Sequence, residues 1–272
     1  MILPILNKYC TTFFLRHFVH LSIITMSNLL GNRQIIKLAK VESTNTYLSE
    51  LQNPLPEGSI VWALNQTKGR GQNHHEWESE PNKNLTFSII LHPVFLPAYK
   101  QFYMSKVIAL AVSDFISLHT DNVSIKWPND VYVGNKKICG ILIENIIEKT
   151  NLKQTIAGIG ININQTKFAS NAPNPVSLTQ LTGQQYDIKE MLLEVCELID
   201  YRYAMLRNDE AETIDKNFNE VLYQYLKPCN FVADGEIFEG IIVGVEPTGE
   251  LLIKDKANKI RKFLHKEVEF TF

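Results

Sequence analysis

The 272-residue sequence is poor in cysteine, and its four cysteines stand far apart: Cys10, Cys139, Cys196 and Cys229. None of them forms a C-x-x-C pair, so the pattern is unlike a zinc site or a disulfide framework. Unpaired cysteines are typical of proteins in a reducing compartment. We therefore expect a cytoplasmic protein.

An excess of basic charge is also lacking. Lysine and arginine number 27 against 29 acidic residues, which gives a net charge of −2. Proteins that bind nucleic acid through its phosphates usually carry a clear basic excess, so we expect no DNA partner. With 45% hydrophobic and 21% charged residues, the composition is that of a globular chain that can bury a large core without disulfide or metal staples.

Long uninterrupted apolar runs are absent as well. Residues 1–25 are apolar, but Arg16, His17 and His20 break the run before it reaches the length of a membrane span. Only Lys8 supplies the early basic charge that a signal peptide needs, and no small-residue cleavage site follows. We expect no membrane partner, and we expect residues 1–33 to be an extension outside the fold.

From residue 34 onward the sequence alternates between strand and helix patterns. Runs rich in β-branched and aromatic residues predict strands at 34–41, 59–66, 85–91, 123–127, 131–133, 138–147 and 154–163. Apolar residues at helical spacing predict helices at 98–119, 188–206 and 210–226, and Ser43 is a typical N-cap for a further helix through Leu51. The predicted fold class is α+β, with a mixed or antiparallel sheet backed by helices.

The pattern changes after Pro228, where short strands and glycine turns replace the helical spacing. Turns at Asp234-Gly235 and Thr248-Gly249 separate these strands. The length suits a small SH3-like β-barrel. We therefore expect a main domain over 34–226 and a small β domain over 227–272.

A polar loop of about 18 residues follows the second predicted strand, and long loops inside compact domains are often functional. It contains Gly69-Arg70-Gly71, whose backbone N–H groups could approach a phosphate or carboxylate closely while Arg70 offers a planar donor fork. The loop lacks the third glycine of a dinucleotide site and the G-K-[ST] of a P-loop. An ordinary flexible loop remains the alternative.

A second candidate is Lys126-Trp127-Pro128-Asn129-Asp130, which follows an apolar strand. The lysine ends that strand, so a fixed ammonium at the rim of the sheet could neutralise a carboxylate and a phosphate brought together. The alternative is a solvated lysine at a strand terminus.

A third candidate is the run Gly158 to Asn164, where glycines and asparagines alternate with isoleucines. Glycine in a strand permits close approach of a ligand or of another backbone, so tight sheet packing is the alternative. His74-His75-Glu76 could contribute metal ligands, but no second ligand cluster accompanies them, and we expect no metal site held by the protein alone. Trp77 is expected to anchor the core or a lid.

Together, these segments resemble the biotin–protein ligases, which adenylate biotin and attach it to a carrier lysine. The resemblance covers residues 34–272 and is carried by stretches that keep the family's order: Glu42 to Asn45, Gln66 to Trp77, Asn84-Leu85 with Ser88, Lys126 to Asp130, Gly140 to Glu144, and Gly158 to Asn164. It implies a fold related to class II aminoacyl-tRNA synthetases and lipoate ligases.

The resemblance also implies the site residues. Those implied to bind biotin are Ser43, Thr44, Asn45, Gln66, Arg70, Gly71, Gln72, Lys126 and Gly140. Those implied to bind ATP or the adenylate are Gly69, Arg70, Gly71, Trp77, Asn129 and Asn162. Lys126 and Arg70 are the expected catalytic residues.

Two departures from the family matter. The family's loop usually continues with a glycine near His74, so loop ordering on ligand binding is expected to differ here. Members that double as repressors carry an N-terminal winged helix, which residues 1–33 cannot supply, so we expect a ligase without DNA binding.

The expected reaction joins two anions, because the biotin carboxylate must attack the α-phosphate of ATP. Such chemistry depends on positioning and charge neutralisation, with Lys126 between the anions and Mg²⁺ on the phosphates. A biotin carboxyl carrier protein is the expected partner, and the oligomeric state stays open, with a homodimer as one option. Two rivals are a lipoate or octanoate ligase or transferase of the same fold and a non-catalytic biotin-binding protein.

Overall fold

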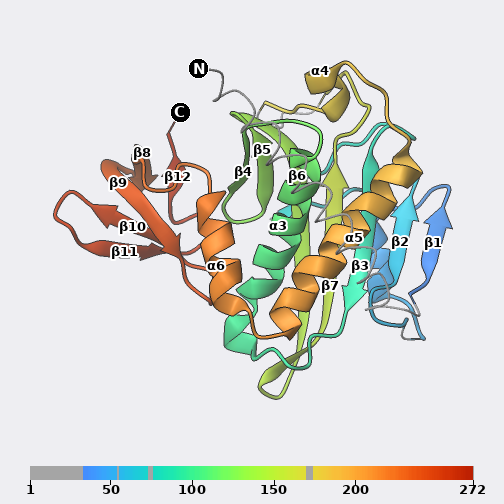
Figure 1. Ribbon diagram of the computed structural model, residues 1–272, viewed down its shortest axis with the longest axis horizontal. Helices are drawn as coiled ribbons and strands as arrows, with labels where there is room; N and C mark the ends of the chain where they lie inside the picture. Colours follow the sequence, from blue (N-terminus) through green and yellow to red (C-terminus); the bar gives the residue numbers. More distant parts are fainter. Residues whose placement is uncertain (1–32, 54, 73–75, 170–173, 272) are drawn as a thin grey trace, which may run out of the picture.

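The computed structural model describes residues 33–53, 55–72, 76–169 and 174–271, which form two sheets and a set of helices (Figure 1). The larger sheet has the strand order β1-β2-β3-β7-β6-β5-β4, and the smaller one has the order β11-β10-β9-β8-β12. Strands of the larger sheet are β1 (Ile35–Leu38), β2 (Ile60–Ala63), β3 (Leu85–Leu91), β4 (Val123–Lys126), β5 (Asp130–Val133), β6 (Lys136–Glu148) and β7 (Asn151–Ile161). Strands of the smaller sheet are β8 (Pro228–Ala233), β9 (Glu236–Val245), β10 (Leu251–Asp255), β11 (Ile260–Phe263) and β12 (Glu269–Phe270).

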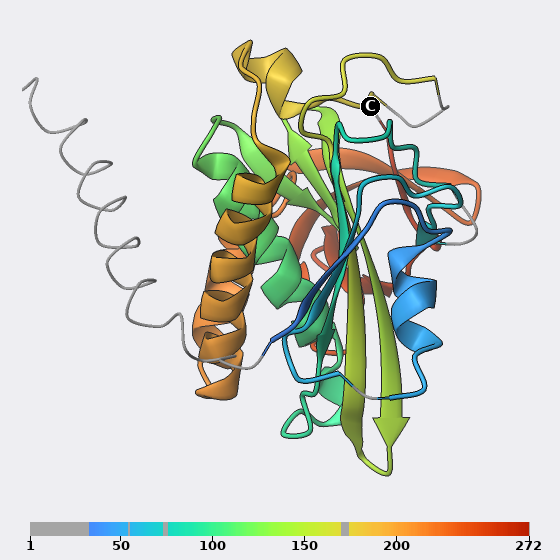
Figure 2. The same cartoon turned by 90° about the vertical axis from the view of Figure 1, so that its right-hand side faces the viewer.

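The larger sheet is mixed, as predicted. β1 and β2 pair in parallel, and the other neighbours pair antiparallel. The helices are α2 (Thr44–Ser49), the short 3₁₀ turn η2 (Ala98–Lys100), α3 (Phe102–Ser117), α4 (Leu178–Thr182), α5 (Ile188–Arg207) and α6 (Ala211–Glu220). Helices α3 and α5 cover one face of the sheet, and α2 lies on the opposite face (Figure 2). The prediction of an α+β sheet backed by helices is confirmed.

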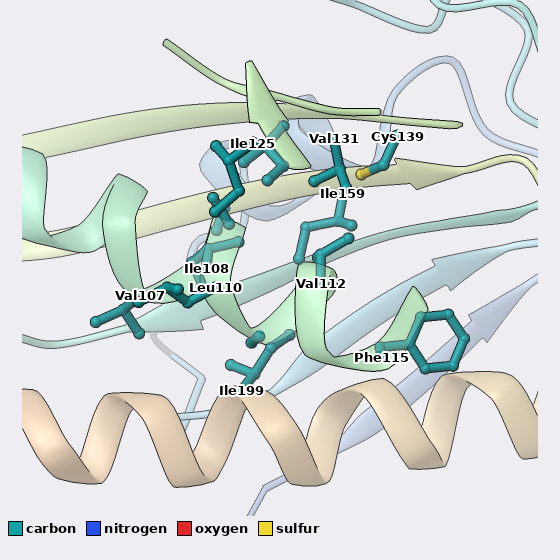
Figure 3. Close-up of a cluster of buried hydrophobic side chains, with 14 of the residues drawn as sticks. Val107, Ile108, Leu110, Val112, Phe115, Ile125, Val131, Cys139, Ile159 and Ile199 are labelled. Atoms are coloured by element: carbon teal, nitrogen blue, oxygen red, sulfur yellow. The ribbon is translucent and has the colours of Figure 1, made fainter. Parts of the chain in front are cut away.

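The main core fills the space between the sheet and helices α3 and α5. Figure 3 shows Val107, Ile108 and Phe115 of α3 close to Ile159 of β7 and Ile199 of α5. All five side chains are buried at 3% exposure or less. Burying aliphatic and aromatic side chains of this size contributes about 1.5–3 kcal/mol each, so this face of the sheet holds the fold together. The opposite face is left for α2 and a cavity.

The helix predicted over 210–226 is wrong in its second half. Helix α6 ends at Glu220, and the chain then runs alongside β4. Ile125 donates its backbone N–H to the Val221 carbonyl at 2.8 Å, and Tyr223 donates to the Ile125 carbonyl at 2.8 Å. Val221 and Leu222 continue the helical spacing of apolar residues, but the backbone groups of Val221 and Tyr223 bind the edge of the sheet instead of continuing the helix.

Other boundaries differ from the predictions by less. The helix expected to start at residue 98 begins at Phe102, after a 3₁₀ turn that follows Pro97. Helix α4 was not anticipated, although Ser177 and Gln180 form a capping box at its start. In the smaller sheet, no pairing among the described residues joins β11 to β12, so a five-stranded antiparallel sheet is shown where a closed barrel was expected.

Candidate active site

A cavity of about 1290 Å³ lies on the face of the larger sheet that carries α2, and its walls come from both sheets. Nearly all of the residues predicted for the site line it: Ser43, Thr44, Asn45, Gln66, Arg70, Gly71, Gln72, Trp77, Lys126, Asn129, Gly140 and Asn162. Gly69 is the exception. Its carbonyl accepts the backbone N–H of Trp77 at 2.9 Å, which closes the base of the glycine loop.

The floor of the cavity is made of glycines. Gly158 and Gly160 alternate with core isoleucines along β7, and Gly140 of β6 is the register partner of Gly160. A Cβ on Gly160 would lie 2.4 Å from the Trp77 indole, and one on Gly158 would lie 2.3 Å from Asn45 Oδ1. Glycine is therefore required here for close approach of the side chains that cover the floor.

One wall is the first turn of α2. Ser43 caps the helix, with its hydroxyl accepting from the Thr46 N–H, and this places Thr44 and Asn45 in the cavity wall. Gln66 Oε1 accepts from the Thr44 backbone N–H at 2.9 Å. The Ser88 hydroxyl lies 2.6 Å from Thr44 Oγ1 and 2.5 Å from Asn45 Oδ1.

Ser43, Thr44, Asn45 and Ser88 are 0–4% exposed, so the orientation of these side chains is fixed before any ligand binds. A network of this kind can recognise a small polar group such as an amide or a urea.

Lys126 lies at the rim, where β4 ends and pairs with Asp130 of β5. Its Nζ stands 5.1 Å from the ring centroids of both Tyr132 and Phe270. Burial lowers the pKa of the Lys126 ammonium, an effect that Asp130 opposes and the positive charge of Lys137 reinforces. The Lys137 ammonium itself is 2.7 Å from Asp130.

The residues after Lys126 hold the motif in place. The Trp127 indole N–H donates to the Gly249 carbonyl at 2.9 Å, which joins the motif to the smaller sheet. The peptide bond between Trp127 and Pro128 is cis. Asn129 donates its side-chain amide to the Ile141 carbonyl at 2.7 Å, so that amide fastens the turn to β6.

Four buried polar atoms on cavity-lining residues have no hydrogen-bond partner among the described residues, and one of them, Asp130 Oδ1, lies 2.7 Å from the Lys137 ammonium. The other three are Gln72 Oε1, Trp77 Nε1 and Asn162 Oδ1. All three residues were predicted for the site. Buried polar atoms are normally satisfied, so such atoms in a cavity point to a polar ligand. Asn162 uses its Nδ2 to hold the Val176 carbonyl at 3.1 Å, which leaves only its oxygen for that role.

Sequence reasoning missed the part of the wall that the smaller sheet supplies: His265, Lys266, Val268, Glu269 and Phe270. Burial and the neighbouring Lys266 lower the pKa of His265, which keeps its ring neutral near pH 7. These residues form no sequence motif. The one feature of the sequence that could have pointed to them is their place in the C-terminal segment, which the resemblance already covers.

Clusters of metal ligands and membrane-spanning helices are both absent from the described part of the chain. It contains no group of three metal-ligating side chains. In the His74-His75-Glu76 segment, His74 and His75 lie outside the described residues. The expected effect of His74 on loop ordering therefore stays a prediction. No described helix is long and apolar enough to span a membrane.

Comparisons with known proteins match this geometry. Residues 38–162 match the model of the biotin/lipoate A/B protein ligase family. A biotin–[acetyl-CoA-carboxylase] ligase of Paracoccus denitrificans is 33% identical over 186 residues, which cover 63% of this chain and 77% of that protein. The bifunctional ligase/repressor BirA of Bacillus subtilis is 34% identical over 171 residues, which cover 60% of this chain and 51% of that protein.

Among solved structures, the biotin protein ligase from Aquifex aeolicus in complex with biotin and ATP is similar at a TM-score of 0.73 and 28% identity. The match covers 88% of this chain and 99% of that one. The matched region spans about half the length of the Bacillus relatives. The fold is therefore that of the biotin and lipoate protein ligases. Within them, the chain belongs to the biotin/lipoate A/B protein ligase family, among the biotin protein ligases.

Proposed function

We propose that the chain is an ATP-dependent ligase that forms biotinyl-5′-AMP and transfers biotin to a lysine of a biotin carboxyl carrier protein. The observation that carries this proposal is the half-buried Lys126 ammonium at the rim of a cavity whose far wall is a preformed polar network. The names of the relatives from Paracoccus and Aquifex support biotin and ATP as the substrates.

In the first step, an oxygen of the biotin carboxylate attacks the α-phosphorus of ATP, and pyrophosphate leaves with the electrons of the broken P–O bond. Two anions must meet, so a fixed positive charge between them lowers the barrier. Lys126 supplies that charge, and Arg70 with the amides of the glycine loop holds the phosphate of the adenylate. The polar wall formed by Ser43, Thr44 and Asn45 orients the ureido ring.

In the second step, the amine of the carrier lysine attacks the carbonyl carbon of the mixed anhydride, and AMP leaves. The anhydride must be kept from water until the carrier arrives, which suits a cavity closed by the glycine loop and Trp77. Mg²⁺ would enter with ATP and neutralise charge on its phosphates.

The experiment that tests this proposal measures biotin-dependent exchange of labelled pyrophosphate into ATP, followed by transfer of biotin to a carrier domain. Biotin should drive the exchange, whereas lipoate or octanoate at the same concentration should not. Exchange that depends on lipoate would make the chain a lipoate ligase. Biotin binding without any exchange would make it a binding protein.

Partner and compartment follow from the same proposal. A carrier lysine must reach the mixed anhydride through the open side of the cavity, so the carrier is the macromolecular partner we propose. The described cysteines Cys139, Cys196 and Cys229 are free thiols, which supports a reducing compartment such as the cytoplasm.

A further inference from the structure

Glu144 of β6 bridges two parts of the cavity wall that are far apart in the sequence. Its Oε1 accepts from the guanidinium of Arg70 in the glycine loop. Its Oε2 accepts from Asn45 Nδ2 on the first turn of α2 at 2.7 Å. Each carboxylate oxygen thus has its own donor, and one side chain joins the loop, the sheet and the helix.

We infer that Glu144 is a positioning residue that holds the Arg70 guanidinium over the cavity and couples it to the ligand-recognition wall at Asn45. The inference rests on the proposed function and deepens it, because it assigns a role to a residue that contacts Arg70 rather than the reacting atoms. Without a partner on the sheet, a long arginine side chain on a glycine-bearing loop would sample many rotamers.

The orientation of Asn45 makes the bridge specific. Its Nδ2 faces acceptors only, Glu144 and the Leu142 carbonyl at 3.4 Å, while its Oδ1 faces the Ser88 hydroxyl. A side chain at position 158 would collide with this amide, so Gly158 leaves Asn45 in place. The glutamate therefore meets a fixed donor on one side and a charged donor on the other.

Glutamine cannot replace glutamate in this arrangement. It has the same size but only one acceptor oxygen, so either Arg70 or Asn45 must face an N–H₂ group instead. Whichever way the amide turns, one charge-assisted or polar contact becomes a contact between two donors. Aspartate keeps the charge but is one methylene shorter, so Glu144→Asp should hold one partner and lose the other.

The matched control is Glu148→Gln, at the exposed end of the same strand. Glu148 pairs with Lys153 at 2.6 Å, and its side chain is 60% exposed against 40% for Glu144. An exposed pair of this kind is expected to matter little. Both variants remove one negative charge from β6, so a difference between them reports the contacts of Glu144 with Arg70 and Asn45 and not the net charge.

The experiment measures biotin-dependent pyrophosphate exchange for wild type, Glu144→Gln, Arg70→Gln and the double variant. Loss of one charge-assisted hydrogen bond should raise the biotin KM of Glu144→Gln about tenfold. Its kcat should change less than about threefold. The double variant should lose less than the product of the two single effects, because Glu144 acts in part through Arg70. Effects that multiply in the double variant would overturn the inference.

A second measurement does not depend on activity. Trypsin should cut after Arg70 at least about fivefold faster in ligand-free Glu144→Gln than in Glu148→Gln, with Glu144→Asp in between, because local opening governs cleavage. Equal cleavage rates in folded Glu144→Gln and folded Glu148→Gln would overturn the inference. If Glu144→Gln does not fold, the cleavage rate of Glu144→Asp is compared with that of Glu148→Gln instead. Wild-type protein without biotin-dependent exchange would refute the proposed function, while the cleavage rates would still decide the role of Glu144.

Discussion

Replacing Lys126 is the perturbation that bears most directly on the proposed chemistry. The Lys126 ammonium lies 5.1 Å from the ring centroids of both Tyr132 and Phe270, and burial lowers its pKa. A charge in such a place is screened less than a surface charge. At an effective dielectric of about 20 and a separation of about 4 Å, its interaction with one unit charge is about 4 kcal/mol.

Part of this interaction is already present when substrate binds, and only the part that grows as the two anions meet raises the rate. Removing one preorganised group of this kind typically costs about 10²–10³-fold in rate, or about 3–4 kcal/mol. We therefore expect Lys126→Ala to lose at least about a hundredfold of the exchange rate. Lys126→Arg should recover little of it, because a planar fork does not place its charge where a compact ammonium lies.

The assay is biotin-dependent pyrophosphate exchange at saturating ATP, with a melting curve for each variant to show that it is folded. Lys153→Ala is the control, because Lys153 is an exposed lysine paired with Glu148 and should change the rate less than about twofold. Near-normal exchange in folded Lys126→Ala would refute the role of Lys126 in neutralising charge. The family membership would stand, since it does not depend on this residue alone.

Three further predictions follow from other contacts. Gly160→Val should displace the Trp77 indole from the cavity floor and lower the rate of pyrophosphate exchange at least about tenfold. Its Tm should change by less than a few degrees, because the added side chain meets the indole and not the core. Lys137→Met should raise the pKa of Lys126, because the positive charge of Lys137 helps to lower it. Since the reaction needs protonated Lys126, the alkaline fall of the exchange rate should move to higher pH. A pH profile in which this fall stays in place or moves to lower pH would contradict the prediction. Gln72→Gly should let biotinyl-adenylate escape and increase labelling of bystander proteins, and unchanged labelling at full exchange activity would show that Gln72 does not retain the intermediate.

The sequence predicts much of the site because its polar wall is built from short local segments. The N-cap at Ser43 fixes the first turn of α2, and the alternation in β7 turns Gly158 and Gly160 to the same face. Both features depend on neighbouring residues only. Local pattern is therefore enough to bring these residues to the cavity side of their elements.

Local pattern fails where long-range contacts decide the outcome. Val221 and Leu222 continue a helical spacing, yet the edge of β4 needs backbone partners, and α6 ends before them. The wall around His265 and Phe270 is likewise invisible in the sequence, because it exists only once the smaller sheet has docked against the larger one. Tertiary contacts override propensity in both places.

The docking of the two sheets explains why the Lys-Trp-Pro-Asn segment works as a unit. Trp127 donates to the Gly249 carbonyl of the smaller sheet at 2.9 Å, while Asn129 donates to the Ile141 carbonyl of β6 at 2.7 Å. Elsewhere in the interface, the buried Lys106 ammonium of α3 donates to the Val245 carbonyl at 3.1 Å.

The position of Lys126 is thus set from both sides, because its chain neighbours are fastened to different sheets. Phe270 of the smaller sheet then stands against the ammonium itself. A charge whose task is to meet two anions at one point must be held within a fraction of an ångström. The tryptophan and asparagine of the segment provide that placement through their contacts with the two sheets, as the proposed role of Lys126 requires.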